Sequence, residues 1–161
     1  MIRSVLIAAL AASLGLLLTG CGAGGSGQGS GASAQTTCAG ASAPHHAYLI
    51  VTHADGKSVQ RCVSFKAAEI GGTALMKGSH LEYQTQSFSF GPAMCQIDHQ
   101  PTSFTQCLSS SGPYWSLYVY QGGHWKEASK GFADTDVTSG GALGWIYETS
   151  SSKQMPAKPK T

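Results

Sequence analysis

The sequence contains no asparagine and few charged residues, which limits what the protein can do. Without asparagine there is no site for N-glycosylation. Charged residues make up 11% of the 161-residue chain and the formal charge is only +2, whereas an ordinary soluble domain is about 25% charged. This balance offers nothing to recruit nucleic acid.

The chain also lacks an apolar run long enough to span a membrane comfortably. Its stretch from Val5 to Leu18 falls short of the roughly 20 apolar residues that a transmembrane helix needs. The stretch follows Arg3 and ends in small residues, which are the parts of an export signal. The residues at its end, Leu18-Thr19-Gly20-Cys21, resemble the lipobox of bacterial lipoproteins.

This resemblance implies a signal peptide over residues 1–20 and a diacylglyceryl group on the sulfur of Cys21. The mature protein is then expected at the extracytoplasmic face of the cell membrane, because two or more acyl chains bind a membrane stably. An ordinary secreted protein with an unmodified Cys21 is the alternative. Residues 21–43 are mostly Gly, Ser, Ala, Gln and Thr, which predicts a flexible tether after the lipidated cysteine.

The cysteines support export. If Cys21 is lipidated, four remain, and four cysteines allow three disulfide pairings. There is no Cys-x-x-Cys pair, and an exported chain favours disulfides over a zinc site, which is the rival interpretation. We favour Cys95 with Cys107, since this bridge closes a short loop, and the other pair is then Cys38 with Cys62.

The remaining segment, residues 44–148, has the size of one small domain, and a disordered tail is expected over residues 149–161. Asp55-Gly56 stands between two alternating apolar runs and predicts a hairpin. Helical spacing indicates a helix from about Thr73, and further alternating runs follow it. The fold class predicted is α+β: a mostly antiparallel sheet with one helix, stapled by disulfides.

Several motifs carry a family resemblance. They are Tyr114–Tyr120, Gly122-Gly123-His124-Trp125, Gly131, Gly140-Gly141 and Gly144–Glu148, preceded by Gly72–Lys77 and Cys95–Asp98. In this order they resemble the transcobalamin C-terminal-like domain over about Tyr48 to Glu148. The resemblance implies a β-grasp-like domain that handles cobalamin or another small molecule at the cell surface.

Aromatic residues crowd the last third of the chain and are the candidate ligand-binding residues. Alternation along Tyr114–Tyr120 sends Trp115 to one face of a strand and Tyr118 and Tyr120 to the other. Trp115 and Trp145 are expected mostly in the core. Tyr118, Tyr120 and Trp125 are expected to be exposed.

Catalytic and metal-binding interpretations find less support. Asp134 and Asp136 are a possible calcium pair, but they lack the Gly and Glu positions of a calcium loop. The six histidines show no ligand spacing, and no Gly-x-Ser-x-Gly motif is present. We therefore expect no catalytic residue, metal or cofactor. The function predicted is lipid-anchored binding of a small molecule such as a corrinoid, with a vitamin importer as a partner; the alternative is an interaction module for another envelope protein.

Overall fold

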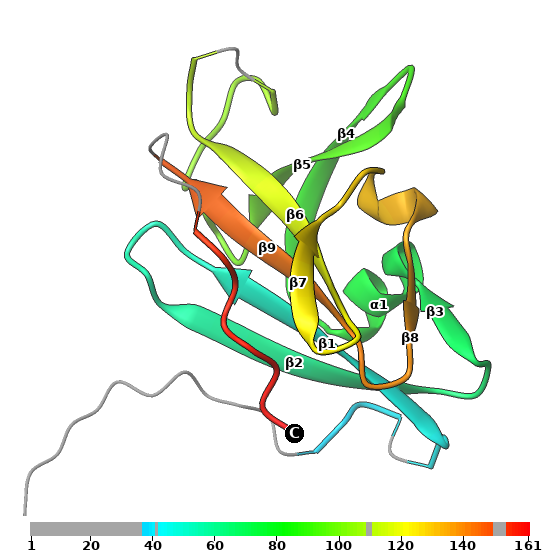
Figure 1. The fold of residues 1–161 in the computed structure, drawn as a ribbon. Helices are drawn as coiled ribbons and strands as arrows, with labels where there is room; N and C mark the ends of the chain where they lie inside the picture. Colours follow the sequence, from blue (N-terminus) through cyan, green and yellow to red (C-terminus); the bar gives the residue numbers. More distant parts are fainter. Residues whose placement is uncertain (1–36, 41, 109–110, 150–153) are drawn as a thin grey trace, which may run out of the picture. The chain divides into compact units, whose positions relative to one another are not determined.

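The structure is a computed structural model that describes residues 37–40, 42–108, 111–149 and 154–161. The predicted signal peptide, Cys21 and the tether up to residue 36 lie outside the described residues. The described chain is mostly antiparallel sheet with one α-helix, a small α+β domain as predicted (Figure 1). Its elements are β1 (His45–Thr52), β2 (Ser58–Phe65), β3 (Glu69–Gly71), α1 (Gly72–Gly78), β4 (Tyr83–Phe88), β5 (Gly91–Ile97), β6 (Tyr114–Gln121), β7 (His124–Glu127), the 3-10 helix η1 (Phe132–Asp134), β8 (Asp136–Thr138) and β9 (Ala142–Glu148).

The first hairpin forms where the sequence predicted it. Gly56 has a φ of 79°, a left-handed conformation that glycine adopts without a steric penalty. The Asp55 side chain accepts a hydrogen bond of 3.0 Å from the backbone N–H of Lys57, an Asx-type contact that stabilises turns. The turn therefore sets the antiparallel register of β1 and β2, with Tyr48 opposite Cys62.

The main sheet has the strand order β2-β1-β9-β6-β7. β1 and β9 are parallel, with Leu49 beside Leu143 and Val51 beside Trp145, and the other neighbours are antiparallel. The first hairpin is thereby joined directly to the last strand. Because side chains alternate along a strand, the sheet has two faces, and both carry apolar residues.

One face of the sheet, called here the helix face, holds the larger core. Leu49 and Val51 point to this face and are fully buried, as are Leu75 and Met76 of α1. Burying a side chain of this size contributes about 1.5–3 kcal/mol, so α1 is held mainly by packing. None of the helices in the described ranges is long and apolar enough to cross a membrane.

Two smaller sheets complete the domain. β3 pairs with β8, placing Ile70 opposite Val137, and β4 pairs with β5. Both β3 and β8 have only three residues, too short for alternation to be recognised in the sequence. Their pairing places η1, which directly precedes β8, next to α1.

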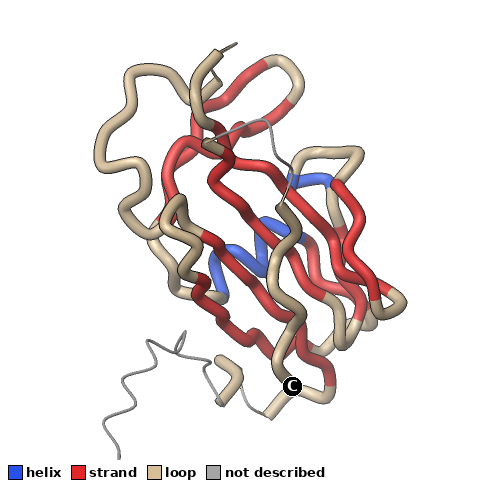
Figure 2. The backbone as a smooth tube through the Cα atoms, turned by 60° about the vertical axis from the view of Figure 1, so that its left-hand side comes forward, coloured by secondary structure: helices blue, strands red, loops and turns tan. Residues whose placement is uncertain are grey.

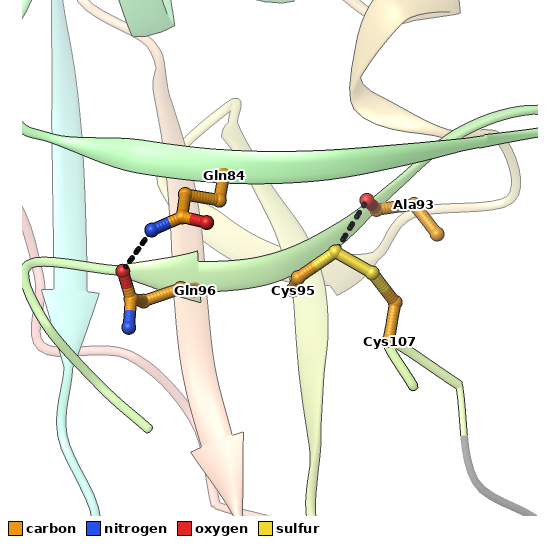
Figure 3. Close-up of a disulfide and its surroundings, with 5 residues drawn as sticks. All are labelled: Gln84, Ala93, Cys95, Gln96 and Cys107. Atoms are coloured by element: carbon orange, nitrogen blue, oxygen red, sulfur yellow. Dashed lines mark hydrogen bonds between the residues drawn. A yellow bond between two sulfur atoms is a disulfide. The ribbon is translucent and has the colours of Figure 1, made fainter. Parts of the chain in front are cut away.

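The two disulfides are Cys38–Cys62 and Cys95–Cys107, the pairing favoured from the sequence. The second bridge ties β5 to the loop before β6 (Figure 3). Beside it, the Gln84 side-chain amide donates a 2.7 Å hydrogen bond to the Gln96 side-chain oxygen across β4 and β5. This corner of the domain is thus stabilised by a covalent cross-link as well as by strand pairing.

The second face of the main sheet, called here the tail face, is covered by the two ends of the domain. Ala39 forms hydrogen bonds with the backbone of Cys62 and Ser64, so the predicted tether ends before residue 43. Residues 154–161 have no helix or strand, yet they run along this face (Figures 1 and 2). A disordered tail was predicted for residues 149–161; of these, residues 154–161 pack on the sheet, which their polar, proline-containing composition did not indicate.

Replacing Cys38 and Cys62 together with alanine should lower the free energy of unfolding by about 2–4 kcal/mol, because the bridge restricts the unfolded chain. Urea unfolding followed by circular dichroism measures the loss. The matched Cys95→Ala/Cys107→Ala variant removes a bridge that closes a loop half as long, 12 against 24 residues of separation, and should lose about 0.6 kcal/mol less. Reaction of Cys38 or Cys62 with a thiol reagent in the folded protein would contradict the pairing.

Candidate functional site

The structure separates the five predicted aromatic site residues into two groups. On β6, Trp115 points to the helix face and Tyr118 and Tyr120 point to the tail face, the alternation predicted from the sequence. Trp145 of β9 joins Trp115 on the helix face, and Trp125 of β7 joins the tyrosines. The structure therefore does not bring the five residues into one binding surface.

The prediction that Tyr118 and Trp125 are exposed is wrong, since they are only 2% and 9% exposed. Tyr120 is half-buried, with its ring centroid 5.1 Å from that of Trp125. The reason is the cover on the tail face: Trp125 packs beside Pro156 of the docked segment. Alternation along a strand indicates which face a side chain takes but not what covers that face.

Trp115 and Trp145 are buried, 8% and 4% exposed, as the sequence predicted. They also line a concave site on the helix face, called here the aromatic pocket, with a volume of about 220 Å³. The pocket lies between β5, the β6 and β9 strands, and the η1 segment. Its lining residues are Phe90, Pro92, Ala93, Met94, Leu108, Trp115, Leu117, Lys130, Gly131, Phe132, Ala133, Asp134 and Trp145.

Aromatic rings in and beside the pocket pack against one another. Phe132 of η1 packs edge-on against Trp145 at 5.9 Å between centroids, and Phe88 stacks on Phe90 at 5.2 Å. Offset and edge-on pairs of this kind contribute about 0.5–1.5 kcal/mol beyond their buried area. A largely preformed apolar wall results, as is usual for small-molecule sites.

The indole N–H groups of Trp115 and Trp145 are buried and have no hydrogen-bond partner among the described residues. Leaving a buried donor unsatisfied costs about 1–3 kcal/mol, and such groups are rare in folded proteins. Trp115 and Trp145 both line the aromatic pocket, and Trp125 on the tail face has a buried indole N–H of the same kind.

A second cavity of about 410 Å³ adjoins the aromatic pocket through Trp115, which lines both. It lies beneath the loop closed by Cys95 and Cys107 and is also lined by Tyr114 and Tyr147. Trp115 and Tyr147 pack at 5.0 Å between ring centroids. Burial raises the pKa of the Tyr147 phenol above its ordinary value of 10.0, because a low-polarity environment disfavours the phenolate.

Exposed hydrophobic side chains gather around these two cavities. Phe90 is 67% exposed, Leu108 46% and Tyr114 45%, and each lines one of the cavities. Sequence reasoning missed Phe90, Leu108 and Phe132 as site residues, because they lie in loops or short elements far apart in the chain. The only local signal was a large apolar side chain in a turn, beside Gly91 in the case of Phe90.

A polar cluster lies at the turn of the first hairpin. The two ring nitrogens of His53 lie 2.9 Å from the Gln100 side-chain oxygen and 3.2 Å from an Asp98 carboxylate oxygen. The backbone N–H of Ala54 donates to the same Gln100 oxygen at 3.0 Å. These contacts tie the hairpin to the segment after β5 and give the cluster a structural role.

The described ranges contain no group of three or more His, Cys, Asp and Glu side chains that could hold a metal ion together. Asp134 and Asp136, the candidate calcium pair, both line a polar depression beside β6 and β7. His99 is largely exposed, with a ring nitrogen 3.5 Å from a Glu82 carboxylate oxygen.

No family model matches the chain, and no curated protein matches it. Among solved structures, it is similar to a Ruminococcus gnavus protein that is provisionally described as metal binding. The sequences are 17% identical, the alignment covers 66% of this chain and 98% of that chain, and the TM-score is 0.47. A likeness at this level carries no information about ligand or activity.

Raising the pH should destabilise the domain through Tyr147. Because its pKa is higher in the folded than in the unfolded state, the folded state keeps its stability below about pH 10 and loses it as the pH rises through the folded-state value. Tyr147→Phe has no phenolic proton, so its free energy of unfolding should fall less between about pH 9 and about pH 11. Urea unfolding at both pH values tests this, with Tyr114→Phe as the exposed control; equal falls in Tyr147→Phe and wild type would contradict it.

Proposed function

We propose that this chain is a lipid-anchored binding protein of the cell envelope that takes a small molecule into the aromatic pocket. The observation that carries the proposal is the pair of buried, unpartnered indole N–H groups on Trp115 and Trp145, both of which line that pocket. Sites for small molecules typically combine apolar walls with a few polar groups that fix the orientation of the ligand.

The lining defines the chemistry of the ligand. Aromatic and aliphatic side chains favour an apolar or conjugated group, and the indole donors favour an acceptor atom on it. Lys130 and Asp134 also line the pocket and are available to polar substituents. The described residues that line the pocket include no serine, cysteine or histidine, and the activity we propose is binding.

A corrinoid is the ligand that the sequence resemblance suggests. The aromatic pocket alone, at about 220 Å³, is below the usual range of about 300–1,000 Å³ for ligand sites. The adjoining cavity of about 410 Å³ extends it. A large macrocycle would therefore insert one edge or side chain and rest the remainder on the exposed rim formed by Phe90, Leu108 and Tyr114.

We further infer that the domain is of the β-grasp type, as in transcobalamin C-terminal-like domains. Three features support this inference: an initial hairpin, a following helix packed on one face of the sheet, and parallel pairing of β1 with the last strand, β9. Together with a lipid on Cys21 and a tether, such a domain would present a ligand at the membrane to an importer.

An interaction module for another envelope protein is the second candidate. The exposed side chains of Phe90, Leu108 and Tyr114 favour it, since clustered apolar residues at a surface mark contact sites for proteins. In that case a partner's side chain would fill the aromatic pocket in place of a free small molecule.

Titration with cyanocobalamin, measured by calorimetry, tests the first candidate. The full chain should give a saturable signal, and Trp145→Phe should weaken binding about fivefold, because it removes one donor worth about 1 kcal/mol while keeping an aromatic ring. Trp125→Phe is the matched control on the other face and should bind like wild type. A flat titration would rule out corrinoids, and equal affinity in wild type and Trp145→Phe would rule out the aromatic pocket as the site.

A further inference from the structure

The tail face carries a slot in which a proline ring is held against a tryptophan. Pro156 is buried, and a side chain at Gly144 would place its Cβ 2.6 Å from the Cγ of Pro156 and 2.8 Å from the ring of Trp125. Only glycine leaves room for both rings at this point of β9. Gly144 lies beside Tyr118 in the sheet register, so a second aromatic residue adjoins the slot.

A second anchor holds the same segment by its backbone. The side-chain amide of Gln60 donates a 2.7 Å hydrogen bond to the carbonyl oxygen of Lys160, and its oxygen accepts a 2.9 Å hydrogen bond from the N–H of Lys160. Gln60 is only 6% exposed and lies on β2, two strands away from Gly144. A buried amide that pairs with both backbone groups of one residue recognises an extended chain whatever its side chains.

The segment that occupies these anchors has the sequence Met155-Pro156-Ala157-Lys158-Pro159-Lys160, which contains a Pro-x-x-Pro motif. Pro156 is buried and Pro159 half-buried, whereas Met155 is 59% exposed. The segment therefore turns its prolines, and not Met155, toward the sheet. Aromatic grooves that bind Pro-x-x-Pro segments work in the same way, because proline fixes an extended backbone before binding.

We propose that the tail face is a docking groove for an extended Pro-x-x-Pro segment of a partner protein, and that the chain's own residues 154–161 occupy this groove in cis. This goes beyond the proposed small-molecule function, since the groove lies on the opposite face from the aromatic pocket. A segment tethered a few residues from its site has an effective concentration of about millimolar. A partner must therefore displace the cis segment.

A labelled peptide with the sequence of residues 154–161 tests the groove. In the full chain, Pro156→Ala/Pro159→Ala weakens the cis segment without changing any residue of the sheet. This variant should bind the peptide saturably, with a dissociation constant of about 0.1 mM, and wild type should bind it about tenfold more weakly, because its own segment competes at an effective concentration of about 1 mM. Fluorescence anisotropy measures both.

Two controls make the outcome decisive. A peptide with both prolines replaced by alanine should not bind. Gln60→Ala, added to the Pro156→Ala/Pro159→Ala variant, should weaken its binding of the unchanged peptide. In wild type, hydrogen exchange should show protection of the Lys160 N–H, which excess peptide removes. The proposal would be overturned if the Pro156→Ala/Pro159→Ala variant did not bind the peptide, or if it bound the alanine peptide equally well. An unprotected Lys160 N–H in wild type would also overturn it.

Discussion

The parallel pairing of β1 with β9 is the constraint on which the rest of the domain depends. It brings the first hairpin beside the last strand and places both strands in the interior of the five-stranded sheet. Along β1 both sets of alternating residues include buried apolar side chains, as Leu49 and Ile50 show by their near-complete burial on opposite faces. A central strand that is apolar on both sides needs cover on both sides.

The two faces of the sheet are covered by different kinds of element. The helix face receives α1, η1 and the β3–β8 pair, and it keeps a cavity where these elements meet Trp115 and Trp145. Within the described part of the chain no helix packs on the tail face, which is covered by the segment bound through Cys38 and by the docked residues 154–161. One face therefore holds a pocket, and the other holds a peptide-like segment.

The sequence predicted the elements whose signals are local. Asp55-Gly56 identified the first hairpin, and period-two alternation predicted the two faces of β6. It could not predict β3 and β8, because a three-residue strand is defined only by its distant partner. The same reason explains the error at Trp125: its burial depends on Pro156, 31 positions later, in a segment whose composition is typical of disorder.

The two proposed sites meet back to back on β9. Gly144 admits Pro156 and Trp125 on the tail face, and its neighbour Trp145 lines the aromatic pocket on the helix face. β9 forms backbone hydrogen bonds with β1 on one side and β6 on the other, so it has little freedom to shift when either site is filled. A ligand changes a second site only if it binds two conformations with different affinities. Because β9 is paired along both edges, we expect the two faces to bind independently.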